Sequence, residues 1–412
     1  MSEVGSPRKP RLLHLIDVLA LRRSIVGVLV VVLLVDLGER MGERFLPIYL
    51  YALGGGALSV GLLNGLDNLL SALYSFPGGY LADRIGSKRS LIVFNLVAII
   101  GFLIVVAFPS WQAVICGAVL FISWSAISAP AMLTLIAKVL PQSKRTMGVS
   151  LHSLVRRVPM AVGPLLGGAF IAAWGEKQGV RMAFVVAAVM AALAIPIQQI
   201  LIHEDHKPSA TASGSGSLRS HPWALVKAMP PSLRSLLVSD ILIRFCEQIP
   251  YAFVVIWCMK TPALVHPVTA PQFGLLTTIE MATAVLIYIP VAYFADRAAK
   301  KPFVVVTFVF FALFPLALFY CRSFWWLVPA FMLRGLKEFG EPTRKALILD
   351  LSAEEQKGAM FGTYYLVRDV IVSLAAFGGA FLWRIGPATN LAAAVLFGVA
   401  GTAWFALRGR DQ

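Results

Sequence analysis

VGLLNGLDNLLSALYSFPGGYLADR, residues 60–84, aligns without a gap with FGLLTTIEMATAVLIYIPVAYFADR, residues 273–297. The two segments are identical at nine of 25 positions, and both carry an acid at the same place, Asp67 in the first and Glu280 in the second. Both are otherwise apolar over the length that a membrane-spanning helix needs, about 20 residues. A duplicated membrane segment with a duplicated acid indicates two related halves, an organisation typical of secondary transporters.

The composition of the whole chain predicts an all-α integral membrane protein. Of the 412 residues, 58% are hydrophobic and 14% are charged, and the mean hydropathy is +0.78. These values are far too apolar for a soluble enzyme of this length. The formal charge of +15 is spread over short connections, which argues against a nucleic-acid partner. It fits the positive-inside rule instead, with both termini in the cytoplasm and the chain crossing a bacterial-type inner membrane many times.

The chain divides into about twelve apolar runs, each long enough to cross a bilayer. Residues 1–23 form a polar, basic stretch before the first apolar run. This pattern predicts that the first run is a retained membrane span and not a cleaved signal peptide. The longest polar stretch separates the sixth run from the seventh, so we predict an N-terminal six-helix half over residues 1–203, a cytoplasmic linker over 204–233 and a C-terminal six-helix half over 234–412. The approximate runs are 24–50, 58–82, 90–108, 112–138, 146–173, 180–202, 235–260, 272–295, 303–321, 325–348, 358–383 and 388–407.

The repeat between the halves extends beyond the opening pair. Asp36, Arg40 and Glu43 in the first run have the spacing of a second set, displaced by 204 residues, in the seventh run, which consists of Asp240, Arg244 and Glu247. Arg156 in the fifth run likewise corresponds to Arg368 in the eleventh, and Gly167 corresponds to Gly378. The copies also differ: Arg157 corresponds to Asp369, and Arg44 corresponds to Gln248. Such differences are where we expect a substrate to be recognised.

The connection after the second run carries a motif. It reads Gly79-Tyr-Leu-Ala-Asp83-Arg84-Ile-Gly86-Ser-Lys88-Arg89, and a degenerate copy with Asp296 and Arg297 follows the eighth run. This resembles the Gly-x3-Asp-Arg-x-Gly-x-Lys/Arg-Lys/Arg loop of the major facilitator superfamily, at the same two places in a chain of six plus six spans. The resemblance implies two pseudo-symmetric six-helix bundles around a central cavity. It also implies a gating loop in which Asp83 and Arg84 help to latch one state.

The fifth run carries a second motif, formed by Gly163, Pro164, Gly167 and Gly168. It resembles the core of the Gly-Pro-x-x-Gly-Gly motif of the superfamily's antiporters, and its small residues predict close helix packing. The regular glycines expected upstream are replaced, and the fourth run lacks the Arg-x-x-Gln-Gly pattern of proton-coupled exporters. The resemblance therefore favours antiport without deciding it.

Nineteen charged residues fall inside the predicted spans, ten of them acids and nine of them bases. Charges facing lipid are costly, so most must pair with one another or line a hydrated cavity. An internal salt network is one interpretation, because Asp36 and Arg40, like Asp240 and Arg244, have the spacing of helical ion pairs. Asp67 and Glu280 have no base within a turn on their own run. They are the leading candidates for proton coupling, with Asp36 and Asp240 after them.

The remaining charged and aromatic positions are candidates for lining the substrate cavity. Arginines at symmetry-related places near the membrane midplane suit a carboxylate or a phosphate. In the tenth run Gly335, Gly340 and Pro342 predict a bend or an unwound segment and hence a moving gate. The cavity candidates are Arg40, Glu43, Arg156, Arg244, Glu247, Arg334, Glu338, Tyr364, Arg368 and Asp369.

We therefore predict a monomeric secondary transporter, without a cofactor or a metal, that exports a small organic solute in exchange for protons across the lipid bilayer. An uptake symporter or an exchanger for an organic anion is the alternative. A non-transporting sensor or an intramembrane enzyme is a weaker one, because the sequence contains no catalytic or nucleotide-binding motif. The four cysteines show no paired spacing of a disulfide framework or a zinc site.

Overall fold

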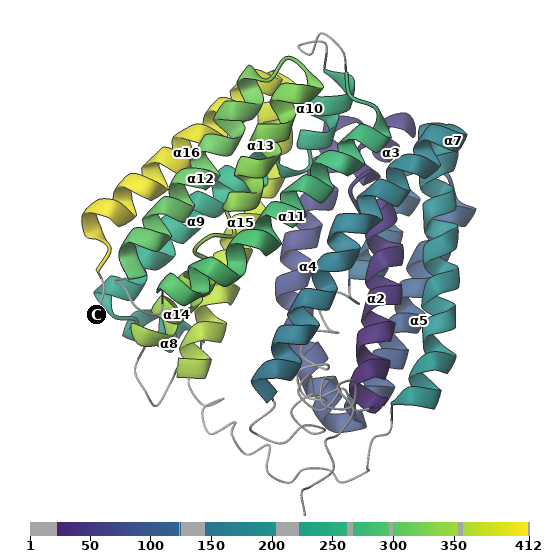
Figure 1. The fold of residues 1–412 in the computed structure, drawn as a ribbon, viewed down its shortest axis with the longest axis horizontal. Coiled ribbons are helices and arrows are strands. Elements are labelled where there is room, and N and C mark those ends of the chain that lie inside the picture. The colour runs from purple at the N-terminus through teal and green to yellow at the C-terminus, as the bar shows by residue number, and fades with distance from the viewer. Residues whose placement is uncertain are drawn as a thin grey trace, which may run out of the picture.

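The structure, a computed structural model, describes residues 23–122, 124, 145–202, 222–261, 267–295, 300–352 and 357–410. In this part of the chain all regular secondary structure is helical (Figure 1). Seven of the helices described are long and apolar enough to cross a membrane by length and composition. The predicted all-α membrane class is confirmed.

The N-terminal helices occupy the positions of the first six predicted spans. The long α7 contains two of these spans, because its backbone leaves helical geometry at Gly175, where φ is 76° and ψ is 172°, a conformation that glycine adopts readily. Of the fourth span the structure describes the helix Trp111–Ile122 and Trp124, while the rest lies outside the described residues. The other bounds are α2 (Arg23–Glu43), α3 (Leu46–Ala52), α4 (Gly56–Ile85), α5 (Ser87–Ala107) and α7 (Arg145–Leu201).

The C-terminal helices occupy the positions of the last six predicted spans. The short α8 lies in the stretch predicted as a linker, residues 204–233, of which residues 204–221 are outside the described part. The bounds are α8 (Pro222–Ala228), α9 (Pro231–Tyr251), α10 (Val254–Lys260), α11 (Ala270–Ala295), α12 (Lys300–Tyr320), α13 (Phe324–Leu336), α14 (Glu341–Asp350), α15 (Lys357–Ile385) and α16 (Pro387–Arg408).

The interruption predicted in the tenth span is confirmed. Helix α13 ends at Leu336 and α14 begins at Glu341, with residues 337–340 forming turns between them. Pro342 occupies the first turn of α14, where a missing backbone N–H costs nothing. Of the predicted spans that are not among the seven apolar helices, the tenth is interrupted in this way, the fourth lies partly outside the described residues, and the first, α2, carries several charges.

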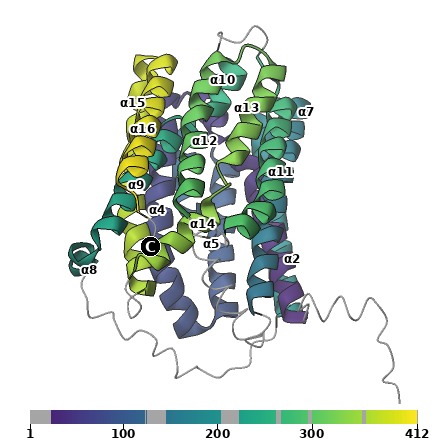
Figure 2. The ribbon, with the colours of Figure 1, turned by 60° about the vertical axis from the view of Figure 1, so that its left-hand side comes forward.

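The helices pack in two sets that touch along two seams. Helix α2 packs against α7 and α5 packs against α7, while α9 packs against α16 and α15. Figure 1 shows the set that begins in purple, α2 to α7, beside the set that ends in yellow, α9 to α16. The seams between the sets are α4 against α15 and α7 against α11, and Figure 2 shows α11 running beside α7. A duplicated chain thus forms two helix sets with an interface on which residues from both meet.

The core of the N-terminal set is aromatic. The rings of Phe102, Phe121 and Phe184 form a cluster with centroids 5.3–5.9 Å apart, which joins α5, the helix Trp111–Ile122 and α7. All three side chains are almost completely buried. Aromatic side chains bury large areas, so this cluster holds the helices that surround the site in a fixed arrangement.

Candidate functional site

A cavity of about 350 Å³ lies between the two helix sets. Its walls come from α2, α3, α4, α7 and the helix Trp111–Ile122 on one side, and from α9, α10, α11 and α13 on the other. The charged lining residues are Glu39, Arg40, Glu43, Arg44, Asp67, Arg156 and Arg334, and aromatic rings of Phe121, Tyr251 and Phe273 complete the wall. The cavity is therefore amphipathic, with charges of both signs facing apolar and aromatic surfaces.

Helix α2 supplies one charged face of the cavity. Glu39, Arg40, Glu43 and Arg44 lie within two turns, and positions three or four apart share a helix face. The Arg40 guanidinium donates to the Glu43 carboxylate in an ion pair. Asp36, one turn earlier and 2% exposed, pairs with Arg156 of α7 at 3.1 Å between Oδ2 and Nε. Most charge on this face is thus neutralised by a neighbour inside the N-terminal set.

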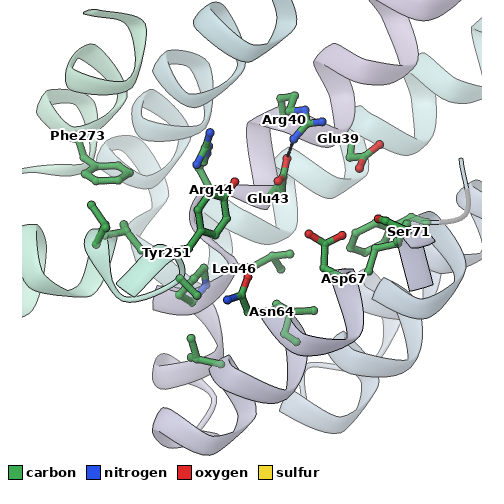
Figure 3. Close-up of a pocket in the computed structure, with 18 of the residues that line it drawn as sticks. Glu39, Arg40, Glu43, Arg44, Leu46, Asn64, Asp67, Ser71, Tyr251 and Phe273 are labelled. Atoms are coloured by element: carbon green, nitrogen blue, oxygen red, sulfur yellow. Dashed lines mark hydrogen bonds and ion pairs between the residues drawn. The ribbon is translucent and has the colours of Figure 1, made fainter. Parts of the chain in front are cut away.

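Asp67 faces the cavity from α4. Asn64 and Ser71 lie on the same helix face and also line the cavity, and the Asn64 side chain donates to the Gln248 carbonyl oxygen of α9 at 3.2 Å. Figure 3 shows the Asp67 carboxyl group directed toward Glu43. Within the described residues, no side-chain nitrogen of Lys, Arg or His lies within 4.0 Å of the Asp67 carboxylate. Asp67 is a cavity acid without an ion-pair partner in that part of the chain.

Glu280, which corresponds to Asp67 in the second copy of the repeat, lies in a different environment. Its side chain is 0% exposed, and its Oε1 lies 3.3 Å from Nε of Arg334 and 3.6 Å from Nζ of Lys337. It does not line the cavity; its partner Arg334 does. Two copies of one acid therefore have separate surroundings, one open to the cavity and one enclosed in a buried ion cluster.

The buried cluster extends through the C-terminal set. Lys337, in the turn between α13 and α14, also pairs with Glu247 at 2.7 Å, and Glu247 accepts from Arg244 at 2.6 Å. This arrangement brings together three positions predicted from the sequence, Arg244, Glu247 and Arg334. Within the described residues, none of the cavity's lining comes from Arg244 or Glu247, so in this conformation both hold helices together.

Asp240 is the centre of a second buried network. It is 0% exposed, pairs with Arg344, lies 3.3 Å from Arg368 and 3.9 Å from Arg244, and accepts a hydrogen bond from the Tyr364 hydroxyl at 3.1 Å. Its sequence counterpart, Asp36, pairs with Arg156. Because Arg344, Arg368 and Tyr364 all donate to Asp240, its buried charge is compensated from α14 and α15.

Two further predicted positions, Asp369 and Glu338, lie at the edges of these networks. Asp369 pairs with Arg368 at 2.7 Å. Glu338, in the interrupted tenth span, accepts from Arg157 of α7 at 3.4 Å, an ion pair that joins the two helix sets. Arg368 and Tyr364 are buried around Asp240 and are not part of the cavity wall.

The gating-loop motif is more compact than the sequence indicates. Helix α4 continues to Ile85 and α5 begins at Ser87, so the connection is Gly86 alone, with φ 90° and ψ 150°. A positive φ is strained for any residue with a Cβ. Lys88 donates to the carbonyl oxygens of Ile202 and Gln199 at 2.7 and 3.1 Å, which caps the end of α7.

The structure describes the side chains of only some of the other residues in this motif. Arg89 is exposed. The backbone of Gly79, Asp83 and Arg84 belongs to α4, but their side chains are not described, and Asp296 and Arg297 lie outside the described residues. The latch formed by these charges stays a prediction.

The Gly-Pro motif of α7 lies against two other helices. A Cβ added at Gly163 would come within 2.6 Å of the Arg40 Cβ, and one at Gly167 within 2.0 Å of the Met41 carbonyl oxygen, both on α2. A Cβ at Gly168 would meet the Ala270 carbonyl oxygen of α11 at 2.5 Å. The motif therefore lets α7 approach both the cavity helix α2 and the opposite helix set.

Arg44 and Tyr251 line the cavity but were not among the cavity candidates, although Arg44 was noted as a difference between the two halves. Arg44 and Tyr251 face each other from opposite helix sets, with the guanidinium carbon 5.2 Å from the ring centre, and Figure 3 shows them side by side. In the described part of the chain no carboxylate oxygen lies within 4.0 Å of the Arg44 guanidinium nitrogens. The signal for Arg44 was available, because it follows Arg40 by one turn and differs from its counterpart Gln248. Lys337 had a signal only as one of the charges inside the tenth predicted span, and Tyr251 had none, since it belongs to no motif.

Comparison with known proteins then identifies the family. The model of the Major Facilitator Superfamily matches residues 28–264 and 251–412. The chain belongs to the major facilitator superfamily. It is similar to an uncharacterized MFS-type transporter of Methanocaldococcus jannaschii, with 22% identity over 85% of this chain and 86% of the relative. It is also similar to the quinolone resistance protein NorA of Staphylococcus aureus, with 27% identity over 48% of each chain.

Solved structures of the superfamily share this fold. The nucleoside transporter NupG matches with a TM-score of 0.75 at 12% identity, over 92% of this chain and 99% of the other. A bacterial homolog of the human lysosomal transporter Spinster matches with a TM-score of 0.73 at 16% identity, over 98% of each. The predicted major facilitator fold is confirmed, and the chain is a multi-pass membrane protein of a transporter family.

Within the part of the chain that the structure describes, no group of three or more His, Cys, Asp or Glu residues could hold a metal ion. The cysteines described are free, with Cys246, Cys258 and Cys321 buried and Cys116 exposed. The chemistry that the site offers is charge and hydrogen bonding toward a solute.

Proposed function

We propose that this major facilitator superfamily member is a secondary active transporter that exports a small organic solute in exchange for protons. The two halves, residues 1–203 and 234–412, alternate access to the cavity while residues 204–233 join them on the cytoplasmic side of an inner membrane. A cavity of about 350 Å³ between the helix sets supports this proposal, since small-molecule sites have volumes of about 300–1,000 Å³.

The environment of Asp67 is the observation that carries the proposal. It is a cavity-lining acid with no basic partner in the described residues, and it faces Glu43, whose charge is already met by Arg40. An uncompensated carboxylate in a partly desolvated site is unfavourable, and a bound proton or a cationic group of a substrate removes the cost. Asp67 therefore suits alternate occupation by a proton and by a solute, which is what exchange requires.

Contacts between the helix sets supply candidates for the gates. Glu176, next to the Gly175 kink, pairs with Lys260 at the end of α10 at 2.6 Å. Phe45 and Phe273 meet edge to face, with ring centroids 5.8 Å apart. In the proposed topology both contacts lie toward the outer surface and close the cavity there. The loop residues Asp83, Arg84, Asp296 and Arg297 are proposed to close the opposite side in the alternate state.

The tenth span is proposed as the moving element. Its interruption at residues 337–340 carries Lys337, which joins Glu247 and Glu280, and Glu338, which reaches Arg157 of the other helix set. Breaking the Arg157–Glu338 pair removes an ion pair between the helix sets without disturbing the pairs made by Lys337. A rocking movement can therefore start from one partly exposed ion pair.

Transport in proteoliposomes tests the proposal. NorA is named for quinolone resistance, so a quinolone is a suitable first solute, followed by a solute library ranked by thermal shift, because a bound ligand raises apparent stability. We expect a one-unit pH gradient, equivalent to 1.36 kcal/mol, to drive about tenfold accumulation of a solute exchanged for one proton. Solute-driven alkalinisation or acidification of a dye-loaded lumen reports the proton directly.

The rival function, uptake or exchange of an organic anion, rests on Arg44. This cavity cation has no carboxylate partner within the described residues and lies over the Tyr251 ring, a setting that suits a carboxylate or a phosphate. Counterflow of an organic acid that persists after the pH gradient is collapsed, with no movement of protons, would favour anion exchange and contradict proton-coupled export.

A further inference from the structure

A second hollow, of about 530 Å³, lies away from the central cavity on the C-terminal helix set. It is formed where α9 begins and α16 ends, by residues on one side that include Arg234 and Ser235 and on the other by Trp404, Arg408 and Arg410. None of these residues takes part in the cavity or in the ion networks around Asp240 and Glu280. The transport mechanism therefore does not account for this site.

The hollow is strongly cationic. The Arg234 guanidinium donates to the Lys227 carbonyl oxygen, and the Arg408 guanidinium carbon lies 4.2 Å from the centre of the Trp404 ring. Over the residues that the structure describes, no carboxylate oxygen lies within 4.0 Å of Arg234, Arg408 or Arg410. Three guanidinium groups around one hollow attract an anion, and their planar N–H donors match the oxygens of a phosphate.

The hollow also holds two unmatched polar groups. The indole Nε1 of Trp404 and the hydroxyl oxygen of Ser235 are both buried and have no hydrogen-bond partner among the described residues. Both residues line the hollow. A buried donor without an acceptor is unfavourable, and phosphate or ester oxygens entering the hollow would satisfy both groups.

Part of the wall of the hollow is apolar and exposed. Val238, one turn beyond Arg234, is 40% exposed, and Leu407, next to Arg408, is 85% exposed. In a membrane-spanning protein such side chains face acyl chains, while tryptophan and arginine at helix ends mark the headgroup level. The hollow thus combines an anion-binding floor with a lipid-facing wall, and a free phosphate would use only the floor.

We propose that this hollow binds the phosphate headgroup of an anionic phospholipid from the cytoplasmic leaflet. Three sets of residues suit that ligand. The arginines pair with the phosphate charge, Trp404 and Ser235 donate hydrogen bonds to headgroup or ester oxygens, and Leu407 and Val238 contact the acyl chain. Basic pockets at the cytoplasmic ends of membrane helices are suited to such lipids. The site ties the first and last helices of the C-terminal half to the bilayer surface.

Fluorescence quenching tests the proposal with Trp404 as the reporter. Full-length protein is placed in nanodiscs of phosphatidylcholine containing increasing amounts of phosphatidylglycerol with brominated acyl chains, and the Trp404 signal is the difference between the wild type and Trp404→Phe. We expect saturable quenching at low phosphatidylglycerol content, and an affinity about fivefold weaker for each arginine removed, as in Arg234→Ala or Arg408→Ala. Arg408→Lys, which keeps the charge, should retain most of the affinity.

Matched controls separate this site from general attraction to a charged membrane. Arg384→Ala removes an exposed arginine from the end of α15 and should leave the affinity unchanged. Equal quenching by brominated phosphatidylcholine, or equal loss of affinity in Arg384→Ala, would overturn the proposal. Inorganic phosphate that displaces the lipid and stabilises the protein equally well in pure phosphatidylcholine would show a free-anion site instead and would overturn the lipid assignment.

Discussion

The two copies of the duplicated segment place the same acid in opposite settings. Asp67 of α4 opens into the cavity, and the described residues offer its carboxylate no basic partner. Glu280 of α11 is fully buried, between Arg334 and Lys337. The first setting leaves a charge available to a ligand, and the second uses the charge to join helices. Duplication thus supplied two acids, and their surroundings decide which of them can act in transport.

The same contrast holds for the second duplicated acid. Asp36 pairs with Arg156, which itself lines the cavity, whereas Asp240 is surrounded by Arg344, Arg368 and Tyr364 away from the cavity. The N-terminal set therefore presents most of its charges to the cavity, whereas the C-terminal set holds most of its own in buried networks away from it. We infer that the solute and the proton are handled mainly by the N-terminal wall.

The largest effect that we expect is on the stability of the buried copy. Glu280→Gln removes the carboxylate that pairs with Arg334 in a buried site and leaves Lys337 with Glu247, which should lower the free energy of unfolding by about 3–5 kcal/mol. Asp67→Asn removes a carboxylate that has no ion-pair partner in the described residues, so its cost should stay below about 1 kcal/mol. Thermal unfolding of the purified proteins in one detergent measures both.

This pair of variants tests directly whether Asp67 and Glu280 lie in different settings. Similar losses of stability in Asp67→Asn and Glu280→Gln would mean that Asp67 is also held by a structural partner. A double variant tests whether the lost ion pair is the cause of the instability. Glu280→Gln combined with Arg334→Gln should lower the free energy of unfolding by less than the sum of the two single variants, because both partners are removed together.

A smaller effect separates the glycines of the two halves. Gly167 of α7 and Gly378 of α15 are sequence counterparts, but a Cβ at Gly167 would lie 2.0 Å from the Met41 carbonyl oxygen, while one at Gly378 has no neighbouring atom within 4 Å. We expect Gly167→Ala to destabilise by about 1–3 kcal/mol through overpacking. Gly378→Ala should stabilise by up to about 1 kcal/mol, since alanine favours a helix.

Thermal unfolding and solute binding of the two glycine variants sharpen this second comparison. If Gly167→Ala retained full stability, the close approach of α7 to α2 would not depend on the glycine. If Gly378→Ala were the more damaging change, α15 would be the tightly packed helix, and the Gly-Pro motif would lose its assigned role in placing the cavity wall.

Much of the fold follows from the sequence because its signals are local or repeated. Apolar length predicts the spans, the Gly79–Arg89 motif identifies the superfamily, and Gly335, Gly340 and Pro342 predict the break in the tenth span. The bounds were less accurate, since α4 runs on to Ile85 and the predicted loop shrinks to Gly86. A helix continues where its backbone hydrogen bonds are satisfied, and composition alone does not reveal where that ends.

The site was only partly predictable, because pairing is a property of three-dimensional contacts. The sequence identified Asp67 and Glu280 as equivalent, yet Arg334 and Lys337, which separate their roles, lie more than 50 residues from Glu280 along the chain. Arg368 and Tyr364 carried the same charge and aromatic signals as cavity residues but are buried around Asp240. Symmetry in sequence therefore indicated which residues matter and left open which of them face the solute.

The most direct measurement compares proton movement in Asp67→Asn and Glu280→Gln. Both variants, checked for folding by size-exclusion chromatography, are reconstituted with a pH-sensitive dye in the lumen and given a solute found by thermal shift. The account predicts that Asp67→Asn still exchanges solute for solute but loses solute-driven proton flux and gradient-driven accumulation, while folded Glu280→Gln keeps proton coupling. Full proton coupling in Asp67→Asn, or its loss in Glu280→Gln alone, would contradict the account.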